Sequence, residues 1–119
     1  MKLINNFFYI TRKDEMNSLP VFQVKLRPDH FIYSVHFPNN PVTPGVCLVQ
    51  MAIEILEQHF QRPLQLDTAV NIKFKKPIHP DTEPMFIFNK LAWDGNLLAA
   101  QVSVEDKDSQ FVKMSLRLK

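Results

Sequence analysis

Apolar and polar positions alternate along five segments of the chain. A short one lies near the start, at residues 21–26, and four follow at residues 70–75, 85–93, 97–104 and 111–118. A period of two, bounded by proline or by turn residues, is typical of β-strands with one buried face. The second half of the chain is therefore predicted to be a series of strands.

The connections between these segments predict an antiparallel order. Asp94-Gly95 joins two of them and is a common hairpin turn, and Asp106 opens the next turn. Residues 3–10 form a short apolar patch, for which we expect a turn of helix followed by a strand. Residues 27–43 contain three prolines, so no long regular element is expected there.

One apolar run has a different pattern. Between residues 46 and 56 nearly every side chain is apolar, and the exceptions, Gln50 and Glu54, are followed by Glu57. This spacing places the polar residues on one stripe of a helix that is apolar on its other sides. Such a helix is predicted to be buried, enclosed by the sheet.

Flanking residues indicate the ends of this helix. Pro44 suits the first helical position and Thr43 is expected to be the N-cap, while Arg62-Pro63 is expected to end the helix. Strands, one buried helix and an antiparallel meander together predict an α+β fold of a single domain, residues 1–119.

Composition narrows the possible functions. The chain has 119 residues, a formal charge of +2, one cysteine and two glycines. The small net charge argues against nucleic-acid binding, and the scarcity of glycine excludes a glycine-rich phosphate loop. No apolar stretch is long enough to span a membrane, and the first residues lack a signal-peptide pattern. The lone Cys47 suits a reducing cytoplasm, where we expect the protein to act.

Two motifs point to a family. Residues 36–46, HFPNNPVTPGV, resemble the HFPGxPxxPGV segment of the β-hydroxyacyl-acyl-carrier-protein dehydratases of fatty-acid synthesis, the FabZ and FabA type. Residues 72–81, IKFKKPIHPD, resemble that family's V-[RK]-F-[RK]-[RK]-P-V-x-P-G-D segment. The resemblance covers essentially the whole chain and implies the hot-dog fold, an antiparallel sheet wrapped around one long central helix.

The resemblance also implies roles for individual residues. The motif histidine, His36, would be the base that removes the C2 proton of a 3-hydroxyacyl thioester, and the backbone N–H of Gly45 would hold the thioester oxygen. Phe37, Pro44 and Val46 of the same segment would line the substrate site. No metal and no cofactor is implied, since the substrate is carried on the phosphopantetheine of acyl-carrier protein.

The chain departs from this family at the second catalytic group. The family has a carboxylate fourteen residues after the histidine, and here that position is Gln50, which cannot exchange a proton at neutral pH. Glu54 lies one turn further on the same face. Either Glu54 supplies the proton in its place, or it only caps the polar stripe or pairs with a lysine. Val35 and Asn39 stand where the family usually has glycine, which would reshape the site.

A basic segment suggests a partner. Lys73 and Lys75 fall on one face of the predicted strand, and Lys76 follows them. This cluster is either an ordinary solvated face or, as the resemblance implies, a contact for the acidic acyl-carrier protein. A sheet around a helix leaves an edge strand open, and hot-dog proteins cover it by pairing. We expect a homodimer or a higher oligomer, with an active paralogue as the alternative second subunit.

These features lead to one main hypothesis and two alternatives. The main hypothesis is a 3-hydroxyacyl-acyl-carrier-protein dehydratase, or lyase, of fatty-acid or polyene biosynthesis, altered by the presence of Gln50. The alternatives are an acyl thioesterase and a non-catalytic subunit that binds acyl-carrier protein.

Overall fold

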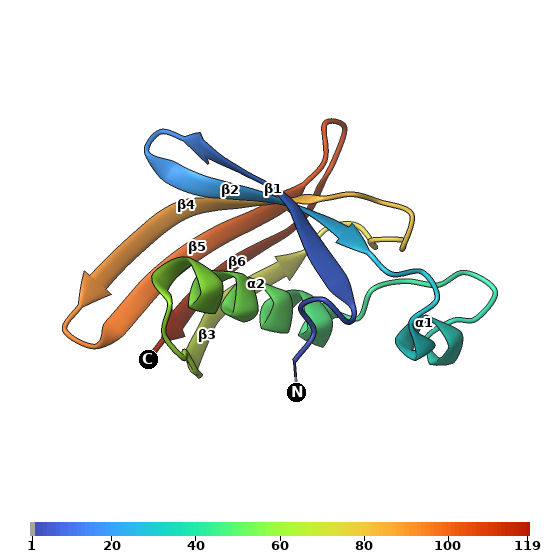
Figure 1. The fold of residues 1–119 in the computed structure, drawn as a ribbon, viewed down its shortest axis with the longest axis horizontal. Helices are drawn as coiled ribbons and strands as arrows, with labels where there is room; N and C mark the ends of the chain where they lie inside the picture. The colour runs from blue at the N-terminus through green and yellow to red at the C-terminus, as the bar shows by residue number, and fades with distance from the viewer. Residues whose placement is uncertain (1) are drawn as a thin grey trace.

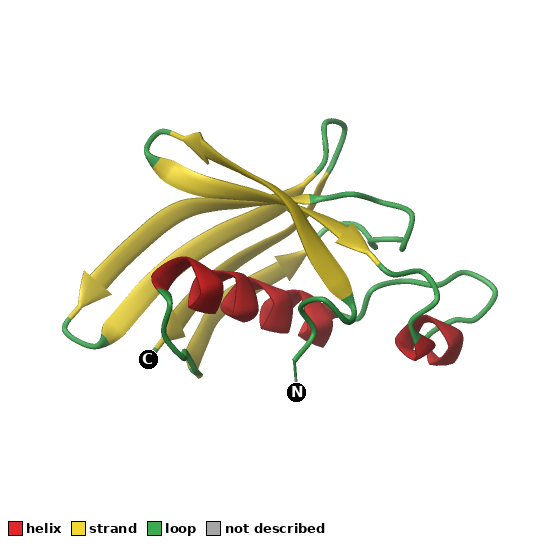
Figure 2. Cartoon of the chain, in the orientation of Figure 1, coloured by secondary structure: helices red, strands yellow, loops and turns green. Residues whose placement is uncertain are grey.

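The computed structural model describes residues 2–119, which form six strands and two helices (Figures 1 and 2). The elements in chain order are β1 (Phe8–Met16), β2 (Leu19–Leu26), α1 (Phe31–Val35), α2 (Gly45–Phe60), β3 (Leu66–Phe74), β4 (Met85–Asp94), β5 (Leu97–Glu105) and β6 (Gln110–Leu118).

All six strands belong to one sheet in the order β1-β2-β4-β5-β6-β3, and each neighbouring pair is antiparallel. The sheet curves, and α2 lies along its concave side, while α1 stands beyond the end of the sheet (Figure 1). The predicted α+β arrangement, with a sheet wrapped around one long helix, is confirmed.

The core lies between α2 and the inner face of the sheet. Met51, Ile55 and Leu56 of the helix are fully buried, and so are Phe86 of β4 and Val102 of β5. Alternate residues of β4, β5 and β6 point inward, which is the physical basis of their period of two. The apolar run of α2 is buried because the sheet encloses it.

The two ends of α2 differ slightly from the prediction. The helix begins at Gly45 and its N-cap is Pro44, not Thr43. The hydroxyl of Thr43 instead forms a 2.9 Å hydrogen bond with the hydroxyl of Tyr33. The helix has no side-chain cap. The C-cap is Gln61, which takes a left-handed conformation just before Arg62.

The start of the chain differs from the prediction in two places. A turn precedes β1 where we expected a helical turn, and β1 extends to Met16. The short helix α1 forms between two of the prolines, with the ring nitrogen Nδ1 of His30 accepting the N–H of Ile32 at its start. The strand expected in this part of the chain is present but longer, whereas α1, with five residues, is too short to show a helical period in the sequence.

The strand β3 forms one edge of the sheet, next to β6. Its side chains are almost all exposed, and Leu66, Val70 and Phe74 are large apolar residues among them. An exposed edge strand with apolar side chains is a surface on which another strand can pair. In the part of the chain described, no helix is long and apolar enough to cross a bilayer.

Candidate functional site

The first turn of α2 is covered by a phenyl ring. A Cβ atom built on Gly45 would lie 2.6 Å from Cζ and 2.9 Å from Cε1 of Phe74, closer than carbon atoms can approach. Gly45 does not have a positive φ, so the constraint at this position comes from the ring, which would have to move to admit a larger side chain. The first N–H groups of a helix have no partner inside the helix, and the helix dipole makes this end attractive to negative charge. The predicted oxygen-binding N–H of Gly45 thus belongs to a residue that packs against the Phe74 ring.

The segment before this helix carries the candidate base. His36 is the C-cap of α1, its backbone N–H donates to the carbonyl of Ile32, and its side chain is exposed. The next residue, Phe37, has φ of 59° and a side chain that is 66% exposed. A left-handed conformation costs a non-glycine residue about 1–2 kcal/mol. This loop therefore holds an aromatic side chain in the open at an energetic cost.

Val35 and Asn39 occupy the two positions at which the resemblance implies glycine. Neither residue has a positive φ. Val35 ends α1 as a helical residue and is exposed. The left-handed residue of the segment is Phe37, one position after the histidine. A β-branched side chain would be strained in a left-handed conformation, and Val35 avoids this strain because it does not adopt one.

The rest of the loop is tied to the segment that follows β3. The N–H of Thr43 donates to the carbonyl of Ile78 at 2.8 Å, and Nδ1 of His79 lies 2.9 Å from the carbonyl of Pro41. Burial raises the pKa of Tyr33 to about 12, so its hydroxyl stays protonated beside Thr43. These contacts fix the path of the loop into α2.

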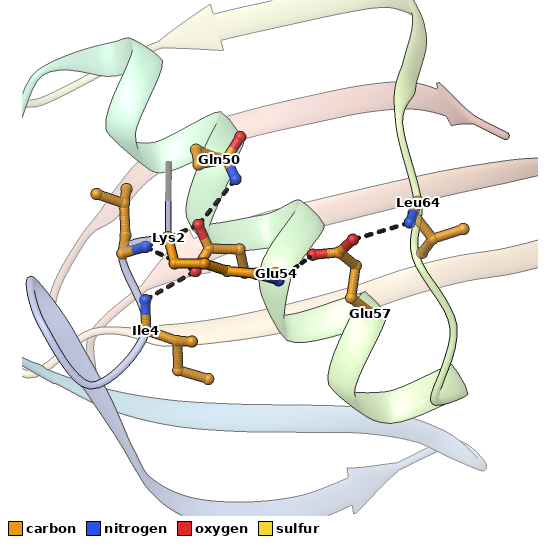
Figure 3. Close-up of polar contacts among 7 residues, drawn as sticks. Lys2, Ile4, Gln50, Glu54, Glu57 and Leu64 are labelled. Carbon is orange, nitrogen blue, oxygen red and sulfur yellow. Dashed lines mark hydrogen bonds and ion pairs between the residues drawn. The ribbon is translucent and has the colours of Figure 1, made fainter.

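Glu54 of α2 is almost completely buried, with 2% of its surface exposed, and the N-terminal segment covers it (Figure 3). Its carboxylate accepts the N–H of Leu3 at 2.9 Å to each oxygen and the N–H of Ile4 at 2.7 Å. It also accepts the side-chain amide of Gln50 at 2.8 Å. Glu54 thus fastens the N-terminal segment to the helix. These contacts favour a structural role, and its role as proton donor stays a prediction.

A second carboxylate lies on the next turn of the same helix. Glu57 accepts the N–H of Leu64 at 2.9 Å and pairs with the ammonium group of Lys2 at 3.2 Å (Figure 3). The lysine partner that we considered for Glu54 is thus found at Glu57 instead. Lys2 is mostly exposed, so this ion pair contributes little to stability.

A groove of about 420 Å³ lies between α2 and the start of β3. Its apolar lining residues are Val46, Val49, Ile53, Leu64 and Leu66, and its polar ones are Lys2, Gln50, Glu57 and Gln65. A second cavity of about 240 Å³ lies beside Phe74, next to Lys75 and Lys76. The groove therefore brings Val46 and Gln50 of α2 together, while Gly45 lies outside its lining.

His36 is separate from these groups within one chain. It lies at the end of α1, which stands apart from the groove side of α2 (Figure 1). Among the hydrogen bonds of residues 2–119, none joins the side chain of His36 to α2.

The basic cluster is larger than the sequence indicates. Ile72 and Phe74 face the helix, so Lys73 between them points to the outer face of the sheet. Directly opposite it on β6 is Lys113, and Arg117 lies further along the same strand. Like charges placed directly opposite each other are destabilising. The described residues provide no carboxylate within ion-pair distance of these three cations.

Lys75 and Lys76 are held at the adjacent end of the sheet. The ammonium group of Lys75 donates to the side-chain oxygen of Gln110, and that of Lys76 donates to the hydroxyl of Ser109 at 3.1 Å. Both lysines are exposed. The sequence could not indicate that Lys113 joins this cluster, because that depends on the register of β3 with β6.

Cys47 is buried at the start of α2, and burial raises the pKa of its thiol. A thiol that resists ionisation is a poor nucleophile, in agreement with its prediction as a core residue. Over residues 2–119, no group of three or more histidine, cysteine, aspartate or glutamate side chains is placed to bind a metal ion.

Comparison with solved structures defines the class of protein. The dehydratase heterocomplex ApeI:P from Xenorhabdus doucetiae aligns with a TM-score of 0.66 at 19% identity, over 92% of this chain and 95% of that one. An uncharacterised protein from Erwinia carotovora subsp. atroseptica gives 0.61 at 20% identity, over 90% and 89%. A protein of the thioesterase superfamily gives 0.59 at 14% identity, over 94% and 83%. These likenesses establish the hot-dog fold.

Sequence comparison then gives the family. The family model described as ApeI dehydratase, ApeI-like, matches residues 11–113, so the chain belongs to the ApeI-like family of hot-dog dehydratases. It is also 28% identical over 91 residues to 3-hydroxyacyl-[acyl-carrier-protein] dehydratase FabZ of Brucella abortus (strain S19), and equally so to that of Brucella ovis. These matches cover 70% of this chain and 57% of each relative, so the chain matches little more than half the length of these curated proteins.

Proposed function

We propose that this chain removes water from 3-hydroxyacyl thioesters carried by acyl-carrier protein, as one subunit of a hot-dog oligomer. The observation that carries the proposal is the start of α2 at Gly45, because it sits inside the dehydratase-like segment and presents helix N–H groups beside a mainly apolar groove. Membership of a dehydratase family supports the same reaction. No cofactor is needed beyond the phosphopantetheine that carries the substrate.

The proposed reaction needs one base and one oxygen-binding group. The imidazole of His36 takes the C2 proton, and the electron pair of the C2–H bond delocalises onto the thioester oxygen as an enolate. The N–H of Gly45 and the dipole of α2 stabilise this negative charge. The enolate then forms the C2–C3 double bond as the C3–O bond breaks, and the imidazolium gives its proton to the departing hydroxyl, which leaves as water. Gln50 binds the hydroxyl and exchanges no proton.

Two subunits would form each site. His36 lies apart from α2 in its own chain, and β3 offers an open edge with exposed apolar side chains. Pairing through this edge would place the loop of one subunit near the helix of the other. The second subunit is either a copy of this chain or a related hot-dog protein, and the heterocomplex named in the ApeI:P structure supports the second possibility.

The acidic partner would meet the cations on the outer face of the sheet. Lys73, Lys113 and Arg117 lack carboxylate partners among the described residues, and Lys75 and Lys76 continue the cluster toward Phe74. Unpaired charges of one sign speed association with a partner of the opposite sign. We expect Lys113→Glu to slow association with acyl-carrier protein at low salt and to remove most of its salt dependence.

A second candidate function is a non-catalytic subunit that binds acyl chains. Gln50 favours it, because the position of the family's acid holds an amide. One assay separates the possibilities: the purified protein is incubated with 3-hydroxyacyl- and acyl-carrier-protein, and the products are identified by mass spectrometry. Loss of 18 mass units that is absent in His36→Ala supports the dehydratase. Release of the acyl group indicates a thioesterase, and an unchanged substrate indicates binding only.

A further inference from the structure

The ring of His79 donates a hydrogen bond in a defined direction, and the group that it contacts is the cause. Its Nδ1 lies 2.9 Å from the carbonyl oxygen of Pro41. A carbonyl only accepts hydrogen bonds, so Nδ1 must carry the hydrogen, and in the neutral ring Nε2 carries none. Because proline has no backbone N–H, Pro41 can be held only through this carbonyl. The side chain of His79 therefore fastens the backbone of the loop at Pro41.

The segment that carries His79 is a firm support for this contact. Ile78, the residue before it, is 1% exposed and belongs to the core, and its carbonyl accepts the N–H of Thr43 at 2.8 Å. The ring of His79 is half-buried and lines a cavity of about 360 Å³ together with Asp81. Within the described part of the chain Asp81 forms no ion pair with this ring. The carbonyl of Pro41 is thus the group that orients the imidazole.

The loop before Pro41 is fixed little by packing. Residues 36–40 are all exposed. The N–H of Asn40 donates to the carbonyl of Phe37 at 2.8 Å, but this bond closes a turn within the loop and attaches it to nothing else. The position of the loop therefore depends on its hydrogen bonds to the segment that follows β3.

We propose that His79 is a positioning residue for the dehydration reaction, and that its hydrogen bond to Pro41 sets where the loop presents His36. This inference rests on the proposed function. Pro41 lies five residues after His36 and four residues before Gly45, so the contact holds the chain between the two groups on which the reaction depends. A displacement of about 1 Å away from the productive geometry can cost about 100-fold in rate. His79 acts through the backbone and touches neither the substrate nor the reacting atoms.

Two substitutions of nearly equal shape isolate this hydrogen bond. In His79→Asn the amide nitrogen is the same number of bonds from the backbone as Nδ1, and it can donate to Pro41. In His79→Asp the corresponding atom is an oxygen, which only accepts and repels the carbonyl. We expect kcat to stay within about threefold of wild type in His79→Asn and to fall by about 10–100-fold in His79→Asp. KM should change by less than about threefold in both, because His79 makes no contact with the bound substrate.

The assay is the initial rate of water loss from 3-hydroxyacyl-acyl-carrier-protein, followed by mass spectrometry well below the melting temperature of each variant. His59→Asn is the matched control and should keep the wild-type kcat. His59 is also half-buried, but its Nδ1 contacts the side chain of Lys13 and not the loop. A second measurement needs no turnover: nitrogen NMR of histidine-labelled protein should show Nδ1 of His79 protonated.

The outcomes separate this inference from the proposed function. Equal kcat values in folded His79→Asn and His79→Asp overturn the positioning role and leave the proposed function standing, and so does a change confined to KM. A neutral His79 ring protonated at Nε2 overturns the inference whatever the activity. If His79→Asp does not fold, His79→Leu, which also lacks a donor, takes its place in the same comparison. If folded wild-type protein releases no water from the substrate, the proposed function fails and this inference fails with it.

Discussion

The contact between Gly45 and Phe74 leads to a prediction in the form of a double-mutant cycle. In Gly45→Ala the new methyl group would lie 2.6 Å from the ring, so the ring must swing outward. Phe74 is 56% exposed, which leaves somewhat less than half of its surface buried. Since full burial of a phenylalanine contributes about 1.5–3 kcal/mol, losing this part costs about 1 kcal/mol.

The helix gains a similar amount from the same substitution. Alanine is more favourable than glycine inside a helix by roughly 0.5–1 kcal/mol. The free energy of unfolding of Gly45→Ala should therefore lie within about 1 kcal/mol of the wild-type value. In a Phe74→Ala background the ring is gone, and Gly45→Ala should stabilise the protein by roughly 0.5–1 kcal/mol. The coupling between the two positions is then about 1 kcal/mol.

Urea denaturation followed by circular dichroism measures all four proteins of the cycle. Gly95→Ala is the matched control: Gly95 has φ of 60° and no neighbouring atom within 4 Å, so its cost should be the same with or without Phe74. A large loss in Gly45→Ala that persists in the Phe74→Ala background would refute the reasoning, because the clash would then involve more than the ring. Despite near-normal stability, Gly45→Ala should lose thioester binding, since its methyl group crowds the helix N–H.

Three further predictions concern other sites. Glu54→Ala leaves the N–H groups of Leu3 and Ile4 unpaired and should lower the free energy of unfolding by roughly 2–4 kcal/mol, measured by urea denaturation. Burial and Lys13 lower the pKa of His59 in the folded protein. The contribution of His59 to stability is therefore present above its unfolded pKa of about 6.5 and is lost as pH falls toward the folded pKa. Between pH 7.5 and 5, the melting temperature of His59→Gln should fall less than that of wild type. Phe37→Gly should raise the free energy of unfolding by up to about 1 kcal/mol in chemical denaturation, because glycine accepts the left-handed backbone.

The sequence predicted the elements whose partners are close along the chain. The period of two and the Asp94-Gly95 turn identify β4, β5 and β6, which are consecutive both in the chain and in the sheet. The pairing of β3 with β6 and of β2 with β4 was beyond prediction, because no local pattern encodes which distant strands meet. The Lys73–Lys113 pair follows from the first of these pairings and was missed for the same reason.

The candidate site was predicted in part. The motif located Gly45 at the start of α2, but the ring above it depends on where β3 ends. The polar stripe placed Gln50 and Glu54 on one face, although Glu54 proved to be buried. The reason is that the backbone of the N-terminal segment supplies its partners, and a side-chain pattern contains no information on backbone donors 50 residues away.

The open edge of β3 has a consequence for how this protein is handled in the laboratory. This edge strand, which is paired only with β6, is also the strand whose last residue, Phe74, packs against the first turn of α2. If subunits associate through this edge, dilution would separate them. The edge of β3 would then be exposed, together with the end of the strand that positions the Phe74 ring. Ligand affinity would then depend on protein concentration, and measurements made at nanomolar and micromolar protein would not be interchangeable.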